Sequence, residues 1–316
     1  MKTKALFEEF SRQQPNLLPF CMSYDWWNEV IQEHWDVAVV ANGKQVLAIW
    51  PYFIRKKGPW KLISNAYFTP YGGPIYLYPE GQKNDSKISF EHKMNQELIA
   101  QLPEFAELNQ HFHLNFKNAL AFIWKGFEVQ QRYTYLLDLN QIKETIWSGF
   151  RENCRREIRK ADKSLSISEN NDFSLLENLL SESFQSQGEK NSGVPKEYFE
   201  RIMAYVLKHK CGKSWKAVDA NNEIYASILC IWDHQTAYYL IGGASTKHKN
   251  SGAMSLLLWH AIQFSMEIGK VKFNFEGSTI PAIERYLRGF GGELQSYSRI
   301  SKKASTSFSL AKKLKG

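Results

Sequence analysis

The chain has 316 residues, of which 43% are hydrophobic and 14% aromatic, and it carries a formal net charge of +8. This composition excludes a generally disordered chain, and the length exceeds what one compact core usually organises, so two domains are expected. The four cysteines are far apart and form no CxxC pair, which argues against a disulfide framework or a zinc site and favours reduced thiols. The N-terminus lacks the apolar core of a signal peptide and no apolar run approaches the length of a membrane span, so we expect a cytoplasmic protein.

The first half of the chain predicts helices and loops over its first 35 residues, followed by a β-hairpin. Two apolar runs, 37–41 and 46–53, are joined by Asn42-Gly43, a strong local hairpin signal. Further elements are expected after this hairpin: strands near 60–64 and 75–78, a helix around 91–101 and a strand near His113. The strand 133–137 then ends at a turn over 138–141, which we take as the domain boundary.

The second half repeats this rhythm. A long amphipathic helix is expected first, with an apolar stripe at helical spacing: Ile146, Phe150, Cys154, Ile158, Ala161 and Leu165. Strands 215–220, 224–232 and 237–241 follow, then a helix over 251–268 that Gly269 terminates. A strand with Val271, Phe273 and Phe275 on one face, a short helix from Pro281 to Leu287 and a last strand over 294–300 complete the order. Antiparallel hairpins that feed a crossover helix indicate an α/β domain.

Positive charge gathers in two stretches. Arg151 to Lys163 carries six bases against three acids, and residues 301–316 contain five lysines and no acid. Such patches attract phosphates, tRNA or an anionic membrane surface. A solvated helix face and a frayed chain end explain each stretch equally well.

Three phrases in this order resemble the FemAB-like and BioF2-like acyltransferases of the GNAT superfold. They are WKGFEVQQRYTYLLDL (124–139), RENCRREIRKADK (151–163) and FNFEGSTIPAIERYLRGFGGEL (273–294), and the resemblance extends from about Asp36 to Ile300. It implies an α/β (α+β) fold of two tandem GNAT-like domains, each a mixed, mostly antiparallel sheet flanked by helices. The expected domains are residues 1–140 and 141–300, followed by a basic tail over 301–316.

The resemblance also implies a chemistry, in which a substrate amine attacks an activated ester or thioester. The amine must be neutral, the carbonyl oxygen stabilised and the leaving group protonated, and positioning alone can do much of this without a covalent nucleophile. Glu276 follows a strand at the carboxyl end of an open sheet, where ligands gather, and is our candidate acid–base residue. A carboxylate that caps the next helix or pairs with an arginine is the structural alternative. Tyr238 and Tyr239 point to opposite sheet faces, and Tyr239 is the second catalytic candidate.

Donor phosphate is expected on a loop and on basic side chains. Lys247 to Ala253 stands where GNAT proteins present backbone N–H groups to coenzyme A, but it retains only the final glycine and small residue of the usual pattern. Leu287 stands where the family commonly has a lysine. Both departures weaken the case for acetyl-CoA and leave aminoacyl-tRNA open. The donor-binding candidates are Lys247, Lys249, Gly252, Arg285, Arg288, Arg155 and Arg159.

The acceptor side is expected in the first domain. Tyr71, Gly72, Trp124 and Lys125 resemble the region that shapes it in the family, and a glycine there would let a ligand approach the backbone. A tight turn before the next strand explains the glycines equally well. His111 and His113 alternate on a strand with no third ligand nearby, so no metal is expected.

These observations favour a FemAB-like N-acyltransferase that moves an aminoacyl or acyl group to an amine of a cell-envelope precursor or related metabolite. No cofactor is required, and the donor is aminoacyl-tRNA or acyl-CoA. The expected partners are a small-molecule amine, tRNA, and an anionic membrane surface contacted loosely through the basic tail. A conventional acyl-CoA N-acyltransferase, a non-catalytic binding protein on the same scaffold and a peripheral membrane adaptor remain alternatives.

Overall fold

The computed structural model describes residues 2–185 and 193–313, with side chains as far as Leu310, and the chain forms two compact units. Unit 1 comprises Met1–Arg132 and Ser296–Gly316, and unit 2 comprises Tyr133–Gln295. Strands β6 (Glu128–Asp138) and β12 (Glu293–Lys303) each run from one unit into the other. The units therefore divide inside two strands and not at the expected positions 140 and 300. The residue pattern of a strand continues across the division between two units, so the sequence indicates only where the strand ends.

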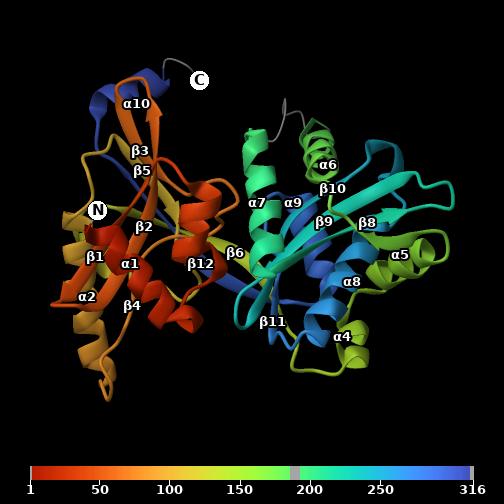
Figure 1. Cartoon of the computed structure of the whole chain (residues 1–316), viewed down its shortest axis with the longest axis horizontal. Helices are drawn as coiled ribbons and strands as arrows, with labels where there is room; N and C mark the ends of the chain where they lie inside the picture. The colour runs from red at the N-terminus through yellow and green to blue at the C-terminus, as the bar shows by residue number, and fades with distance from the viewer. Residues whose placement is uncertain (1, 186–192, 314–316) are drawn as a thin grey trace. The chain divides into compact units, whose positions relative to one another are not determined.

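Unit 1 is built on a sheet in the order β1-β2-β3-β5-β12, with β4 paired to β2 (Figure 1). The first three strands are antiparallel, β3 and β5 are parallel, and β5 and β12 are antiparallel. Its strands are β1 (Trp35–Asn42), β2 (Gln45–Lys57), β3 (Trp60–Ser64), β4 (Ile75–Tyr76) and β5 (Glu107–His111). Its helices are α1 (Lys2–Gln13), η1 (Pro15–Leu17), η2 (Phe20–Met22), η3 (Trp26–Ile31), α2 (Asn84–Ala100), α3 (Leu120–Trp124) and α10 (Thr306–Lys313).

The elements expected in unit 1 are present, but β4 ends at Tyr76 and not at 78, and the strand expected near His113 is β5, which ends at His111. The β1–β2 hairpin turns at Asn42-Gly43, where Gly43 has φ +61° and Asn42 is in register with Gln45. Helix α2 begins at Asn84, seven residues before the expected start at 91. Its first turns are exposed and polar, so they carry no apolar periodicity from which to predict them.

Apolar side chains from the sheet, α2 and α3 form the core of unit 1. The rings of Phe112 and Phe122 lie 5.2 Å apart edge to face, and Trp50 contacts both. The indole N–H of Trp50 donates to Gln110 Oε1 at 2.8 Å, so the one polar atom of this buried ring is satisfied.

Unit 2 has a sheet in the order β6-β11-β10-β9-β8-β7. β10 and β11 are parallel and the other neighbours are antiparallel. The remaining strands are β7 (Ser166–Glu169), β8 (Gly212–Val218), β9 (Ile224–Trp232), β10 (Thr236–Ala244) and β11 (Lys272–Asn274). The helices are α4 (Lys143–Gly149), α5 (Glu152–Asp162), α6 (Phe173–Gln185), α7 (Lys196–His209), η4 (Thr246–His248), α8 (Ala253–Glu267), α9 (Pro281–Leu287) and η5 (Arg288–Phe290).

The long helix expected at the start of unit 2 is two helices, and that prediction was wrong. Phe150 has extended backbone angles between α4 and α5, and the N–H of Arg151 donates to Gly289 O at 2.9 Å. The apolar stripe is nonetheless buried along both helices. A break that keeps the stripe facing the core leaves the helical spacing intact, so the sequence pattern does not reveal it.

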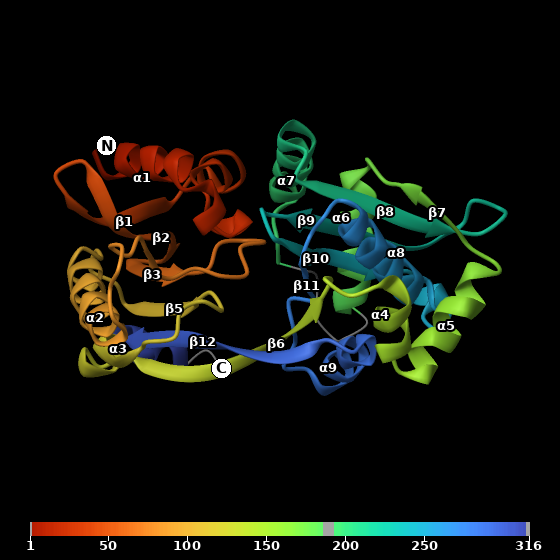
Figure 2. The same ribbon diagram turned by 90° about the horizontal axis from the view of Figure 1, so that it is seen from below.

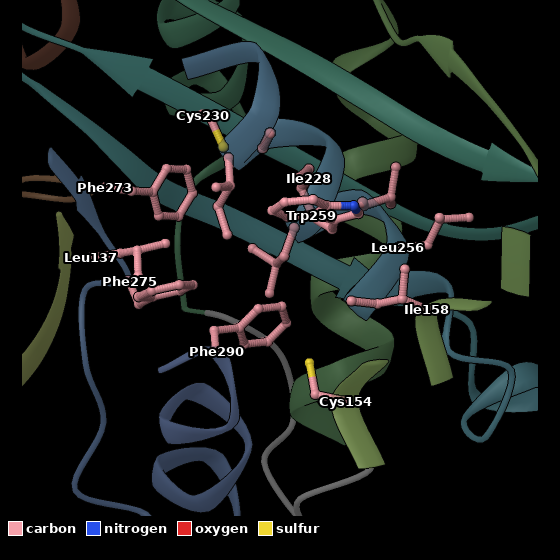
Figure 3. Close-up of a cluster of buried hydrophobic side chains, with 14 of the residues drawn as sticks. Leu137, Cys154, Ile158, Ile228, Cys230, Leu256, Trp259, Phe273, Phe275 and Phe290 are labelled. Atoms are coloured by element: carbon pink, nitrogen blue, oxygen red, sulfur yellow. The ribbon is translucent and has the colours of Figure 1, made fainter. Parts of the chain in front are cut away.

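The core of unit 2 lies beneath α8 and α5 (Figure 3). Phe290 contacts Phe150 at 5.2 Å and Phe275 at 5.4 Å between ring centroids. Phe273 and Phe275 are buried as expected for their face of β11. The helix that the sequence predicts over 251–268 is α8, and Gly269 ends it with φ +73°.

The basic stretch at the C-terminus is largely structured. Residues 301–303 complete β12, and α10 follows, with Phe308 buried against Trp60 at 5.4 Å. Lys302 donates to the carbonyl of Lys125 at 2.7 Å. The side chains of Lys312 and Lys313, and all of Lys315, lie outside the described residues. Among the described residues, no helix has the length and apolar character needed to cross a bilayer.

Candidate active site

The two parallel strands of unit 2 part at the point where the sequence places its candidate residues. β10 and β11 pair from Thr236↔Lys272 to Tyr238↔Asn274, where β11 ends. β10 continues along β9 to Ala244, with a shift in register between Tyr239 and Ile241. The strands thus open after Tyr238 and Asn274, a split that exposes polar backbone at the carboxyl edge of the sheet.

Glu276 lies directly beyond this split in a left-handed backbone conformation, with φ +62°. Its N–H donates to Asn274 Oδ1 at 2.9 Å, and the buried Asn274 also accepts from Thr134 Oγ1 at 2.7 Å. Gly277 follows with φ +55°, and a Cβ there would stand 2.1 Å from Tyr133 O. Only glycine fits this position, so the turn that presents Glu276 is fixed by close packing against β6.

The carboxyl group of Glu276 is buried. The residue as a whole keeps some exposed surface, but its Oε1 atom has none and no hydrogen-bond partner among the described residues. Burial raises the pKa of Glu276 well above its usual range. No carboxylate–arginine pair and no helix cap involves Glu276 in the described part of the chain, contrary to the structural alternative. A buried acid without a partner at a strand split suits proton transfer.

Tyr239 lies on β10 at the split, and Tyr238 faces the opposite side. The Tyr238 hydroxyl donates to Asp233 Oδ2 at 2.7 Å, which satisfies it structurally. The Tyr239 ring lies over Gly242, where a Cβ would stand 2.2 Å from the Tyr239 oxygen. Burial raises the pKa of Tyr239, and Cys230 adds to the shift. The Tyr239 hydroxyl therefore stays protonated. A side chain at position 242 would clash with it, so the glycine there is required.

Tyr286, on α9, is a functional candidate that sequence reasoning missed. Its hydroxyl lies 3.2 Å from Ser255 Oγ, and Ser255 donates to Glu157 Oε2 at 3.3 Å. Burial raises the pKa of Tyr286 well above its usual range, and Tyr239 contributes to the shift. The signal in the sequence was a hydroxyl-bearing ring on the short helix after the strand end. Only the fold brings it beside Ser255, 31 residues away.

A pocket of about 230 Å³ opens between α5 and α9. It is lined by residues that include Arg151, Cys154, Glu157, Arg285, Tyr286 and Gly289. Burial raises the pKa of the Cys154 thiol to about 12, and Glu157 adds to the shift, so Cys154 is not a nucleophile at neutral pH. The pocket thus brings two guanidinium groups to the same space as the Tyr286 ring.

The loop expected to hold phosphate is arranged differently from that expectation. Lys247 and Lys249 are exposed, and Gly252 precedes α8 with φ +82°. A Cβ on Gly252 would stand 2.6 Å from the carbonyl oxygen of Glu157, because α5 packs against the first turn of α8 (Figure 2). The Glu157 carboxylate, held by Ser255, also lies at this helix end. Helix α5 therefore lies against the start of α8, where the sequence predicts phosphate binding.

The arginines of the basic stretches divide into paired and unpaired groups. Arg155 and Arg159 both contact Glu152, at 2.6 and 3.2 Å, and Arg288 contacts Glu284 at 3.1 Å. Arg285 lines the pocket, and Arg288 is not among the residues that line it. Arg151, which the sequence marks only as part of a basic stretch, lines the pocket with Arg285.

The four acceptor candidates lie in unit 1 with different neighbours. Tyr71 is buried, edge to face with His113 and Tyr297 at 5.3 Å each. The Gly72 N–H donates to His111 O at 2.7 Å, so this glycine forms a backbone bridge to the end of β5. Trp124 is 60% exposed and lies edge to face with His92 of α2 at 4.7 Å between ring centroids, next to Lys125. The Tyr71-Gly72 pair and the Trp124-Lys125 pair thus have different neighbours within unit 1.

Similarity to known proteins agrees with this geometry. Residues 148–286 match the acetyltransferase (GNAT) domain family. The fold is similar to FemX, with 11% identity over 94% of both chains and a TM-score of 0.61. It is also similar to the lysylphosphatidylglycerol synthetase L-PGS from Bacillus licheniformis, with 11% identity over 88% of this chain and 87% of that one, at a TM-score of 0.54.

A tandem GNAT protein from the clavulanic acid biosynthesis pathway has the same fold, with 10% identity over 86% of this chain and 84% of that one, at a TM-score of 0.54. No curated protein sequence matches the chain. The expected tandem α/β fold is confirmed. Residues 148–286 match the GNAT acetyltransferase family, and the chain as a whole has the fold of FemX and of the tandem GNAT protein.

Proposed function

We propose that this acyltransferase moves an aminoacyl or acyl group from an activated ester or thioester to an amine of a cell-envelope precursor or related metabolite. The observation that carries the proposal is the buried, unpartnered Glu276 carboxyl at the split between β10 and β11. Burying such a group without a hydrogen bond destabilises the fold, so a structural role does not account for it.

Glu276 accepts one proton during the reaction, and Tyr286 donates another. As the amine nitrogen bonds to the carbonyl carbon, its proton passes to the Glu276 carboxylate, whose raised pKa makes it a stronger base than an ordinary glutamate. As the bond from that carbon to oxygen or sulfur breaks, the Tyr286 hydroxyl supplies a proton to the leaving atom. After the transfer, Glu276 loses its proton to solvent water, and Tyr286 regains one from water in the pocket through Ser255, whose hydroxyl Glu157 holds in place. The net result is one proton moved from amine to leaving group, and Tyr239 lines the split between them.

Two proteins of similar fold support different acyl donors. L-PGS supports an aminoacyl donor, and the tandem GNAT protein, whose structure is described as lacking AcCoA, supports a coenzyme A thioester. The covered N-terminus of α8 favours aminoacyl-tRNA, because coenzyme A would lose the backbone N–H groups that GNAT domains offer its diphosphate. A conventional acyl-CoA N-acyltransferase is the second candidate, carried by the family match.

Transfer assays with both donors test the proposal. Purified protein is incubated with radiolabelled aminoacyl-tRNA or acyl-CoA and a panel of amines, and acyl–amine product is counted. We expect transfer from one donor, with Glu276→Gln and Tyr286→Phe each lowering the rate by roughly 100- to 10,000-fold, the usual contribution of a general acid or base. Glu267→Gln, an exposed carboxylate at the end of α8, is the matched control and should retain the wild-type rate.

Two outcomes would contradict the roles assigned here. Wild-type activity in Glu276→Gln removes the acid–base role of Glu276. Absence of transfer from either donor, together with retained binding of one of them, would identify a non-catalytic binding protein.

A further inference from the structure

The geometry points to a phosphate-binding site for the acyl donor in the pocket between α5 and α9, held by Arg151 and Arg285 in place of the N-terminus of α8. This inference rests on the proposed function, because it assigns the pocket to the donor of that reaction. It keeps Arg285 from the seven donor-binding candidates drawn from the sequence, adds Arg151, and leaves out Lys247, Lys249 and Gly252.

The first argument is the charge state of the arginines around the pocket. Within the described part of the chain, neither Arg151 nor Arg285 has an ion-pair partner. Their neighbours along the sequence, Arg155, Arg159 and Arg288, are each paired with a glutamate. Two guanidinium groups that line one cavity and carry no carboxylate partner in the described part of the chain are free to bind an anion there.

The second argument is that the acid in the pocket is already engaged. Glu157 Oε2 accepts from Ser255 at 3.3 Å, and Glu157 Oε1 accepts from Asn153 Nδ2 at 3.0 Å. Both oxygens of its carboxylate are therefore hydrogen-bonded to neighbours on α5 and α8, and Glu157 forms no ion pair with Arg151 or Arg285 among the described residues. The pocket keeps two hydrogen-bond forks of the kind that recognise phosphate oxygens in pairs.

The third argument is position. Arg151 caps α5, so the partial positive charge of the first turn of that helix adds to the two guanidinium groups. Tyr286 lies on the same pocket wall, one residue from Arg285, so a phosphate bound here stands beside the group proposed to protonate the leaving atom. A volume of about 230 Å³ suits a phosphate with its adjoining atoms and not a whole coenzyme.

Equilibrium binding tests the site without relying on turnover. Inorganic pyrophosphate, coenzyme A and unacylated tRNA are titrated against the wild type, Arg151→Ala and Arg285→Ala, with Lys160→Ala as a control for loss of one exposed charge on α5. We expect each arginine variant to weaken pyrophosphate binding and binding of the true donor by roughly 10- to 100-fold. Lys160→Ala should change binding less than threefold. The midpoint of thermal unfolding should be unchanged, since both arginines are exposed.

The three probes distinguish a tRNA donor from a coenzyme A donor. They also test the phosphate site separately from the proposed function. Weakening of tRNA alone identifies a nucleic-acid donor, and weakening of coenzyme A alone identifies a thioester donor. Unchanged binding of all three probes by both arginine variants overturns the site even if the wild type catalyses transfer. Failure of transfer by the wild type, with arginine-dependent pyrophosphate binding intact, contradicts the proposed function and leaves the phosphate site standing.

Discussion

The two units share one strand arrangement, in which two parallel strands separate, but they differ in the polar groups that lie at this opening. In unit 1, β1, β2 and β3 are antiparallel and β3 pairs parallel with β5 as far as Ser64↔Asn109. In unit 2, β8, β9 and β10 are antiparallel and β10 pairs parallel with β11 as far as Tyr238↔Asn274. Each pair of parallel strands then separates.

Unit 1 closes this opening with its own polar groups. Asn65 accepts from the N–H of His111 at 2.7 Å and donates to Thr69 O at 3.1 Å. Gly72 bridges to Phe112 on the other side. These hydrogen bonds join groups of unit 1 to one another across the opening.

Unit 2 leaves the equivalent opening with a buried carboxyl that has no hydrogen-bond partner among the described residues. The same strand order therefore supports a structural joint in one unit and a reaction site in the other. The difference lies in a few side chains beyond the strand ends and not in the fold, which is why fold similarity alone does not locate chemistry.

The largest expected effect comes from the glycines that shape the two openings. Gly277→Ala and Gly73→Ala both place a Cβ on a left-handed backbone, 2.1 Å from Tyr133 O and 2.5 Å from the Phe112 ring respectively. Each should lower the free energy of unfolding by about 2–5 kcal/mol from strain and overpacking. Only Gly277→Ala should reduce transfer to background, because it moves Glu276. Urea unfolding and the transfer assay on the folded fraction measure both, and equal activity loss in the two variants would erase the distinction between the units.

A smaller effect is expected from the group that closes unit 1. Asn65→Ala leaves the N–H of His111 and nearby carbonyls without their partner, so the free energy of unfolding should fall by about 1–3 kcal/mol. Transfer per folded molecule should stay at the wild-type rate. Asn221→Ala, in an exposed turn of unit 2, is the matched control and should change stability by less than about 0.5 kcal/mol. A loss of transfer in Asn65→Ala would mean that unit 1 also takes part in the chemistry.

The smallest effect is a pH dependence that differs in sign between the units. The pKa of Glu276 is raised in the folded state, so the folded protein binds the proton more tightly and its stability falls as pH rises from about 4.5 through the folded pKa. Over the same range the rate of transfer should rise as the base ionises. Glu276→Gln should flatten the decline in stability, as measured by urea unfolding at successive pH values.

His111 in unit 1 provides the counterpart. Burial lowers the pKa of His111 to about 4, and Arg132 and Arg299 add to the shift. Its contribution to stability is complete above about 6.5 and is lost as pH falls toward 4. His111→Asn should therefore flatten the acidic side alone, and a change on the alkaline side would contradict the assignment of the two groups.

The sequence by itself determined features that depend on neighbours along the chain. The turn at Asn42-Gly43, the end of α8 at Gly269, the extent of α9 and the apolar face of β11 all follow from local conformational preference and periodicity. It also singled out Glu276, because residues that follow a strand of an open sheet are predictable from its order, whereas Tyr239 came from the alternation of sheet faces and Arg285 from the family resemblance.

The tertiary structure alone decided what those residues meet. Burial of the Glu276 carboxyl depends on β6, and the pairing of Tyr286 with Ser255 depends on two helices 31 residues apart. The sequence also does not indicate which arginines form ion pairs. The basic stretch 151–163 has the same pattern whether a guanidinium group contacts Glu152 or lines a cavity. Charge and burial arise from contacts between distant segments, and spacing along one segment does not encode them.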